Sequence, residues 1–166
     1  MIQEVIVNSP KYGKNIALVD EEDYIKVSKY TWTLHRNGKT QYAKSRSRGS
    51  LVLMHTVITG YDFVDHIDRN GLNNCRNNLR LGNKIKNSAN VGLMSTNVSG
   101  YRGVHLAKHV KLRPWVAQLS GEGRGYKPWC VVIGRFESPE DAAVAYNEVA
   151  LEWFGDYAYL NIIEGK

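Results

Sequence analysis

The stretch from residue 63 to residue 93 constrains the fold more than any other part of the chain. Phe63 to Ile67 combines β-branched and aromatic side chains, which is typical of a short strand. Residues 68–78 contain five asparagines and one glycine, so they predict a long loop with several Asx turns. Leu79 to Leu81 predicts a second strand, and Asn83 is a suitable N-cap for a helix to about Leu93. We therefore expect the order strand, loop, strand, helix.

This order can bring together side chains that hydrolyse a phosphodiester bond. Asp65 and His66 lie near the end of the first predicted strand, and Asn87 lies on the predicted helix. A carboxylate and an amide oxygen are hard ligands that suit Mg²⁺, and a histidine that titrates near neutrality can take a proton from water. Asn78, at the end of the loop, can bond the loop backbone and hold the histidine strand in register.

The motif also matches a known family. The string from Val64 to Asn74, followed by Asn77-Asn78-Leu79-Arg80 and a downstream asparagine, resembles the HNH (His-Me finger) nucleases, in particular the phage and intron homing branch. The resemblance covers roughly residues 50–92. The family is named for a histidine, an asparagine and a second histidine, and this chain has no histidine at the last of these three positions. Asn87, or alternatively Asn90, occupies that region, as the homing branch permits.

The resemblance implies a role for each motif residue. By it, His66 is the general base, Asp65 and Asn87 hold a single Mg²⁺ or Mn²⁺ ion, and Asn78 orients the loop. His55, in the run Leu53-Met54-His55, is similar to a histidine that precedes the motif in that branch. The resemblance places His55 near the active site among the catalytic residues. For this histidine a structural role and a functional role both stay open.

The C-terminal third predicts a second small fold. Three short β-rich runs, residues 100–104, 115–119 and 130–136, are separated by turn-forming stretches and predict a three-stranded antiparallel meander. A helix follows, with Ser138 as N-cap, Pro139 at its first position, Asp141 completing a capping box and Gly155 at its end. Its apolar stripe predicts core packing on one face of the sheet: Ala142, Ala145, Tyr146, Val149 and Trp153.

This second region resembles the DNA-binding domain of plant ethylene-response factors (the APETALA type). The matching segments are Tyr101-Arg102-Gly103-Val104, Trp115-Val116-Ala117, Ile133-Gly134-Arg135-Phe136, Ala142 to Tyr146 and Phe154 to Asn161. By this resemblance Arg102, His105, Trp115 and Gln118 lie on the DNA-facing strands. The chain departs from the plant pattern on the third strand, where Cys130 and Val132 replace an arginine and a tryptophan. The plant target sequence is therefore not carried over. Core packing is the alternative for Trp115.

Basic residues add a second argument for a DNA-facing surface. A sheet can enter the major groove, and arginines near it can bind phosphates. The chain carries 22 Lys and Arg against 16 Asp and Glu, for a net charge of +6 and a pI near 9.3, which favours a polyanionic partner. The arginines expected to contact DNA are Arg113 and Arg124 in the C-terminal region and Arg46 and Arg48 in an N-terminal hairpin. An ordinary solvated surface is the alternative for these basic residues.

The first fifty residues predict a β-rich platform under the nuclease motif. Residues 16–19 predict a strand, residues 20–30 a short helix, and residues 32–34 and 41–43 two strands of a hairpin whose turn is signalled by Asn37-Gly38. A further strand is expected to carry His55. Cys75 and Cys130 are far apart and imply neither a zinc site nor a disulfide. No run of about 18 apolar residues and no leader segment is present, so we expect a cytoplasmic protein of a bacterial or phage-infected cell.

Together these patterns predict an α+β chain. A ββα-metal (His-Me finger) nuclease module is expected within residues 1–92, a linker at 93–98, and a three-stranded antiparallel sheet packed on one helix at 99–163. The expected function is a metal-dependent, site-preferring homing endonuclease that nicks or cuts double-stranded DNA, as a monomer or weak dimer without an obligate protein partner or membrane contact. Two alternatives are a non-catalytic DNA-binding regulator and an RNA nuclease.

Overall fold

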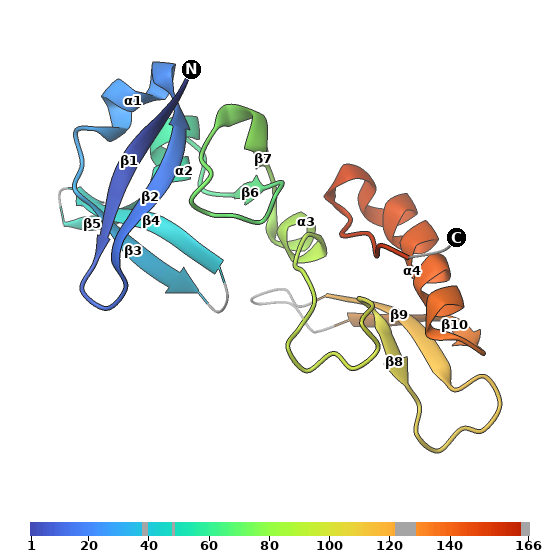
Figure 1. Cartoon of the computed structure of the whole chain (residues 1–166). Coiled ribbons are helices and arrows are strands. Elements are labelled where there is room, and N and C mark those ends of the chain that lie inside the picture. The colour runs from blue at the N-terminus through green and yellow to red at the C-terminus, as the bar shows by residue number, and fades with distance from the viewer. Residues whose placement is uncertain (38–39, 48, 122–128, 164–166) are drawn as a thin grey trace. The chain divides into compact units, whose positions relative to one another are not determined.

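The chain folds into two compact units, residues 1–83 and residues 84–166 (Figure 1). The computed structural model describes residues 1–37, 40–47, 49–121 and 129–163. The fold is mixed α/β, and each unit has its own hydrophobic core. Among the described residues, no helix is long and apolar enough to span a lipid bilayer.

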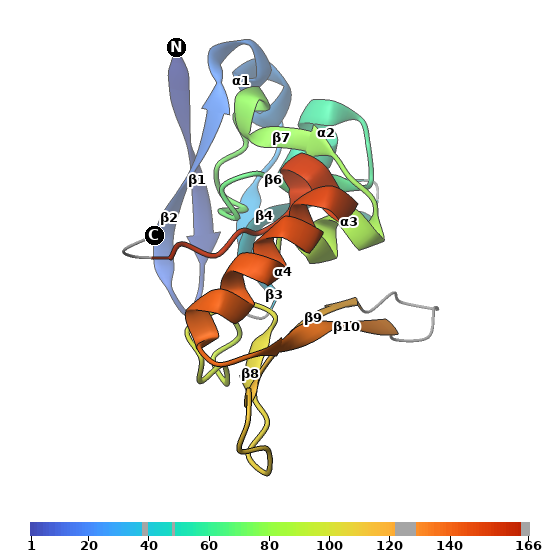
Figure 2. The ribbon, with the colours of Figure 1, turned by 90° about the vertical axis from the view of Figure 1, so that its right-hand side faces the viewer.

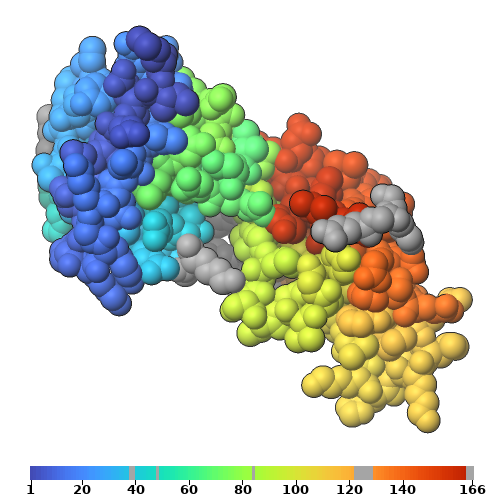
Figure 3. All heavy atoms as spheres, viewed as in Figure 1, coloured from blue at the N-terminus to red at the C-terminus, as the bar shows by residue number. Residues whose placement is uncertain are grey.

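A five-stranded sheet forms the frame of the first unit. Its strands lie in the order β2-β1-β3-β4-β5, where β1 and β3 run parallel and the other neighbours run antiparallel. The strands are β1 (Ile2–Ser9), β2 (Gly13–Asp20), β3 (Trp32–Asn37), β4 (Thr40–Ser47) and β5 (Ser50–Leu53). The sequence predicted strands within β2, β3 and β4. The space-filling view shows β1 and β2 at the surface of this unit (Figure 3).

Two short helices, α1 (Glu21–Val27) and α2 (Met54–Thr59), complete the core of the first unit. The short helix predicted for residues 20–30 is confirmed as α1. The strand predicted around His55 is wrong, because His55 lies in the first turn of α2. Thr59 donates its hydroxyl to the carbonyl of His55 at 2.7 Å. Gly60, with φ of 77°, ends the helix in a left-handed conformation that glycine adopts at low cost.

The motif region adds a two-stranded sheet to this unit. Strands β6 (Val64–His66) and β7 (Leu79–Leu81) pair antiparallel, and a 3₁₀ turn, η1 (Arg76–Asn78), precedes β7. Both strands were predicted. The loop between them docks on β2, where Leu18 donates its N–H to the carbonyl of Leu72 at 2.8 Å and accepts from Asn74 at 2.7 Å. Gly71 touches β4 so closely that a Cβ there would clash with backbone. The long loop is therefore held against the larger sheet.

The second unit contains the predicted three-stranded antiparallel sheet packed on a helix. Strands β8 (Val104–Leu106), β9 (Trp115–Gly121) and β10 (Trp129–Phe136) lie in the order β10-β9-β8. Helix α4 (Pro139–Phe154) lies across one face of this sheet (Figure 2), and a 3₁₀ turn, η2 (Gly155–Tyr157), follows it. The first strand was predicted to begin at residue 100, but β8 begins four residues later, at Val104.

Helix α4 begins and ends where the sequence predicted. The Ser138 hydroxyl accepts the N–H of Asp141 at 3.0 Å, Pro139 is the first helical residue, and Gly155 follows the last. The buried stripe differs in part. Ala143 and Ala150 are buried beside the predicted Ala142 and Tyr146, whereas Trp153 is 53% exposed. Trp153 instead stacks on Trp129 of β10, with ring centroids 5.7 Å apart.

Helix α3 (Lys84–Ala89) belongs to the second unit and is shorter than predicted. The carbonyl of Ala89 accepts the N–H of Tyr159 at 3.1 Å, and the carbonyl of Ser88 accepts Arg102 Nη2 at 2.8 Å. These bonds connect α3 to the segment just before β8, which contains Arg102, and to the segment after η2, which contains Tyr159.

Candidate active site

The β6–β7 pair carries the acidic part of the candidate site. Asp65 lies opposite Arg80 in the strand register, and both side chains are largely buried. Arg80 donates from Nε and Nη2 to Asp65 Oδ2 at 2.8 and 2.7 Å. A charge-assisted contact of this kind fixes the carboxylate in one orientation.

His66 follows Asp65 and is only 5% exposed. Its Nε2 lies 3.3 Å from Oδ1 of Asn74, a fully buried residue whose Nδ2 lies 3.5 Å from the carbonyl of Gly71. Because the amide nitrogen of Asn74 faces a carbonyl, its oxygen faces the ring, and Nε2 of His66 carries the proton. Nδ1 is then the ring nitrogen able to accept a proton.

The electrostatics of His66 suit a neutral base. Burial lowers its pKa below the usual value, although the hydrogen bond with Asn74 and the charges of Asp68 and Asp65 oppose that shift. The net direction is downward, so the imidazole is neutral at physiological pH. A neutral imidazole is the form that can take a proton from water.

Asn78 organises the loop after His66. Its Nδ2 donates to Asp68 Oδ1 and to the carbonyl of Asn73, each at 2.8 Å, and its Oδ1 accepts the N–H of Asp68 at 3.0 Å. Its carbonyl accepts the N–H of Ile67 at 2.9 Å. Burial opposes ionisation of Asp68, but bonds from Asn73, the loop backbone and Asn78 outweigh it and lower its pKa. The side chain of Asn78 therefore bonds the beginning and the middle of the loop.

A second histidine and a tyrosine lie beside His66. The ring centroids of His55 and His66 are 5.1 Å apart at an interplanar angle of 79°. Tyr42 of β4 packs against both, with centroid distances of 5.9 Å to His55 and 5.8 Å to His66. Burial, and next the charge of His66, lowers the pKa of His55 to about 4. The structure thus brings the predicted His55 to the centre and adds Tyr42.

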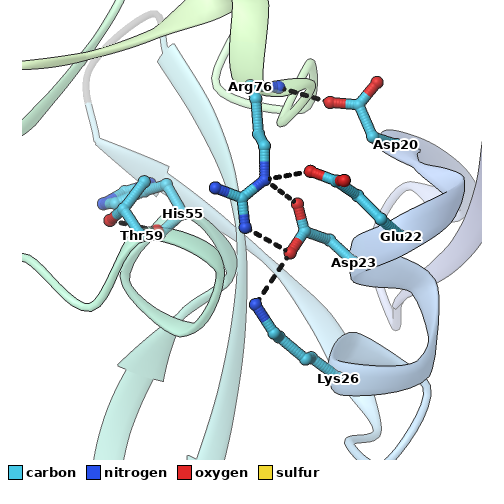
Figure 4. Close-up of polar contacts among 7 residues, drawn as sticks. All are labelled: Asp20, Glu22, Asp23, Lys26, His55, Thr59 and Arg76. Atoms are coloured by element: carbon cyan, nitrogen blue, oxygen red, sulfur yellow. Dashed lines mark hydrogen bonds and ion pairs between the residues drawn. The ribbon is translucent and has the colours of Figure 1, made fainter.

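An arginine clamp holds the end of the loop (Figure 4). The Arg76 guanidinium donates to both carboxylate oxygens of the fully buried Asp23, at 2.6 and 2.8 Å, and contacts Glu22 at 2.7 Å. The backbone N–H of Arg76 donates to Asp20 Oδ2 at 2.7 Å. Burial alone would raise the pKa of Asp23, but Arg76 and Lys26 lower it. The clamp anchors η1, which ends at Asn78, to helix α1.

The expected metal ligands offer oxygen donors only. Asp65 supplies a carboxylate and Asn87, on α3 in the second unit, an amide oxygen. Within the described ranges, no group of three or more histidine, cysteine or acidic side chains is arranged to hold a metal. Mg²⁺ commonly uses one or two protein oxygens and keeps several waters. The chemistry of this donor set therefore fits Mg²⁺ or Mn²⁺ better than a structural zinc ion.

The sheet of the second unit has one face away from α4. The strand register places four side chains on this open face: His105 of β8, Gln118 of β9, and Val132 and Arg135 of β10. Trp115 was expected to face DNA, but it packs against the core beneath α4, on the same side of β9 as Ala117 and Leu119. The alternation of side chains along a strand explains this placement.

The predicted DNA-binding arginines lie in different settings. Arg102 donates from Nε to the Tyr146 hydroxyl and from Nη2 to the carbonyl of Ser88, each at 2.8 Å, so its guanidinium links α4 to α3. Arg46 on β4 and Arg113 before β9 are exposed. Arg48 and Arg124 lie outside the described residues.

The comparison with known proteins decides the family. Over 156 residues the chain is 32% identical to an uncharacterised HNH endonuclease of Acanthamoeba polyphaga mimivirus, and the match covers 89% of this chain and 75% of that protein. This chain belongs to the HNH endonuclease family. A 65-residue stretch of this HNH protein is also 37% identical to protein 3.8 of Escherichia phage T7, covering 39% of this chain and 51% of the phage protein. Both relatives are viral.

No family model and no solved structure matches this HNH chain. The plant-type domain expected for residues 99–163 has no support among these relatives, and the three strands packed on a helix are what the structure establishes. Sequence reasoning missed Asn74, Tyr42 and Arg76. Tyr42 reaches the HNH region from β4, and Arg76 lies in that region but bonds to the distant Asp23. Asn74 lies in the loop itself, where only the density of asparagines hinted at it.

Proposed function

We propose that this HNH protein is a metal-dependent DNA endonuclease whose general base is His66. The observation that carries the proposal is a buried, neutral imidazole beside Asp65, with Nε2 held by Asn74. A base held in one tautomer is ready to act without reorganisation. The net charge of +6 supports a nucleic acid as the substrate.

In this proposal, His66 Nδ1 takes a proton from water as the water oxygen attacks phosphorus. The P–O3′ bond breaks and the leaving 3′-oxygen takes a proton from solvent, so the products carry a 5′-phosphate and a 3′-hydroxyl. The hydrogen bond from Nε2–H to Asn74 Oδ1 stabilises the imidazolium that forms. Asn78 keeps the loop, and with it the histidine, in place.

Asp65 and Asn87 would hold one divalent ion, Mg²⁺ or Mn²⁺, beside the scissile phosphate. When bound, this ion supplies positive charge to the phosphate and to the leaving oxygen. Arg80 keeps the Asp65 carboxylate oriented through Oδ2.

The open face of the β8–β10 sheet is the proposed double-stranded DNA surface. His105 and Gln118 lie on it, and Arg113 and Arg124 of the same unit are proposed to contact phosphates. Arg46 and Arg48 are proposed as separate phosphate contacts of the first unit. Arg102, just before β8, holds this sheet in place through its hydrogen bonds to Ser88 of α3 and Tyr146 of α4. A site-preferring, homing-type activity in a bacterial or phage-infected cell follows from such a pairing of nuclease and DNA-binding units.

The test compares substrates and metals. Purified protein is incubated with duplex DNA, or with structured RNA, in Mg²⁺, Mn²⁺ or chelator, and cleavage and gel shift are measured in parallel. The proposal predicts metal-dependent cutting of DNA with 5′-phosphate ends. Binding of DNA without cleavage in any divalent metal would instead support a regulator, and preferred cleavage of RNA would support an RNA nuclease.

A further inference from the structure

A hollow of about 380 Å³ lies on the five-stranded sheet of the first unit. Its walls come from β4, from β5 and from the beginning of β3, and the residues that line it are Thr31, Thr33, Lys44, Ser45, Arg46 and Leu51. Arg46 and Leu51 are exposed and Lys44 is partly exposed, so the hollow opens to solvent. The chemistry proposed for His66 makes no use of it.

The charge of this hollow is positive. Lys44 and Arg46 both line it, and its described lining contains no carboxylate. Within the described ranges, neither of these two cations forms an ion pair, whereas Lys26 of α1 contacts Asp23 at 3.1 Å. Two neighbouring cations in a depression without a counter-charge favour an anionic ligand.

The sheet holds the two cations on a rigid support. Lys44 lies opposite Thr33 of β3 and opposite Leu53 of β5, so β4 is paired on both sides at this point. The Thr33 hydroxyl donates to the carbonyl of Lys44 at 3.3 Å, and the Ser45 hydroxyl donates to the carbonyl of Thr31 at 2.8 Å. A support that is ordered before binding loses little conformational freedom when a ligand arrives.

The same face of β4 leads to the general base. Because side chains alternate along a strand, Tyr42, Lys44 and Arg46 share one face, whereas Ala43 is buried on the other. The Tyr42 ring packs on the ring of His66, with centroids 5.8 Å apart. Successive side chains on one strand face lie about 6.8 Å apart, which is close to the separation of neighbouring phosphates along a DNA strand. Lys44 and Arg46 therefore form a line that begins beside the reaction centre.

We propose that this hollow binds the backbone of duplex DNA next to the cleavage point, with the cleaved strand running along β4. Lys44 binds the phosphate nearer the scissile bond, and Arg46 binds the next phosphate of the same strand. The inference gives Arg46 a defined place on the substrate and adds Lys44 as a contact. It rests on the proposed cleavage at His66, which fixes where on the DNA the line begins.

These contacts should act on binding and not on chemistry. The two phosphates do not react, so the cations stabilise the bound substrate and the transition state equally. Their loss should raise KM and leave the cleavage rate at saturating DNA unchanged. Each contact also releases counterions from DNA, so its loss should lower the salt dependence of binding.

The first experiment measures binding of a mixed-sequence DNA duplex in chelator over a range of salt concentrations. The variants are Lys44→Gln, Arg46→Gln and the double variant, with thermal unfolding as a check on folding. Lys26→Gln is the matched control, because α1 packs on the core side of the sheet, opposite to the hollow. We expect the slope of log affinity against log salt to fall by about 1 in each single variant and by about 2 in the double variant. The control should keep the wild-type slope, and a wild-type slope in the double variant would overturn the inference.

The second experiment places one uncharged methylphosphonate at successive positions beside the mapped cleavage bond. In wild type, two adjacent positions on one side of the cut should each weaken binding, by up to about 5-fold. Lys44→Gln should abolish the penalty at the nearer position and Arg46→Gln the penalty at the farther one. Equal penalties in all three proteins would place the contacts elsewhere on the DNA, and the reverse order would overturn the direction along β4.

The outcomes separate this inference from the proposed function. If wild type cleaves DNA but the double variant keeps the wild-type slope and penalties, the hollow is ordinary solvated surface and this inference alone fails. If the slopes fall as expected but wild type cuts no DNA in any divalent metal, the proposed function fails, and the placement of the hollow beside a cleavage point fails with it.

Discussion

At the scale of single residues, the buried imidazole of His55 should make folding depend on pH. The folded pKa of about 4 lies below the ordinary value of 6.5, so protonation favours the unfolded chain. The stabilisation is fully present above about pH 6.5 and is lost as the pH falls toward 4. The shift corresponds to about 3 kcal/mol.

Urea unfolding of wild type and His55→Phe at pH 7 and at pH 4 measures this effect. Carboxylates titrate in both proteins, so the informative quantity is the difference between them. We expect wild type to lose about 3 kcal/mol more than the variant between the two pH values. Parallel losses would show that His55 is not held neutral by burial.

The contact between Asn74 and His66 makes a second residue-scale prediction. Asn74→Leu removes the acceptor of Nε2–H but nearly keeps the side-chain volume. We expect cleavage to slow about 10- to 100-fold, the usual cost of losing a group that orients a site histidine. The ¹⁵N spectrum of the His66 ring should show the Nε2–H tautomer in wild type and a mixture in the variant. An unchanged tautomer would separate Asn74 from the orientation of the base.

Sequence alone located part of this centre. The sequence pointed to Asp65, His66 and Asn78 because the acid–histidine pair, the strand that carries it and the loop that follows all lie within about fifteen residues. Asn74 and Tyr42 could not, because their roles depend on docking the loop against β2 and β4, a contact between distant segments. For Trp115 the resemblance implied a DNA-facing strand and core packing was the alternative; the structure shows core packing, and the sequence neighbours do not reveal which side of β9 helix α4 covers.

At the scale of elements, the Arg76 clamp should control the loop between β6 and β7. Arg76→Met leaves the fully buried Asp23 with Lys26 as its remaining charged partner. Breaking a buried ion pair costs several kcal/mol, and because Arg76 is half-exposed we expect a loss of about 2–3 kcal/mol. Lys26→Met, at the exposed end of the same cluster, should cost less than about 1 kcal/mol.

Hydrogen exchange reports the same clamp locally. The amides of Ile67, Arg76 and Asn78, which are bonded within or beside the loop, should exchange faster in Arg76→Met than in Lys26→Met. Equal protection in the two variants would show that docking on β2 alone holds the loop.

Element prediction succeeded where local signals were strong. Helix α4 has a serine N-cap, a proline and a terminal glycine, and its bounds were correct. Helix α2 has six residues and no side-chain cap, so the apolar run before His55 looked like a strand. Its buried residues Met54, His55 and Ile58 fit one helical face, a pattern too short to distinguish from a strand by sequence.

At the scale of the whole molecule, the positive charge of the second unit should govern DNA affinity rather than chemistry. Arg113 is exposed and has a left-handed φ of 52°, which asparagine also tolerates. Arg113→Asn should weaken binding and reduce the slope of log affinity against log salt by about 1. The cleavage rate at saturating DNA should stay the same.

Lys14→Gln provides the matched loss of one positive charge. Lys14 is exposed on β2, the edge strand of the first unit's sheet, and two strands separate β2 from β4, which carries Arg46. We expect a wild-type salt slope for this variant. Equal slopes for both variants would mean that affinity follows net charge alone and would remove Arg113 from the DNA surface.

The central claim is that this HNH protein cuts DNA with His66 as its base. The most direct measurement is nicking of supercoiled plasmid in Mg²⁺ by wild type and by His66→Ala, after gel shift and thermal unfolding have shown that both proteins fold and bind DNA. We predict nicking by wild type that chelator abolishes, and none by the variant above background. Nicking by His66→Ala at the wild-type rate would contradict the account.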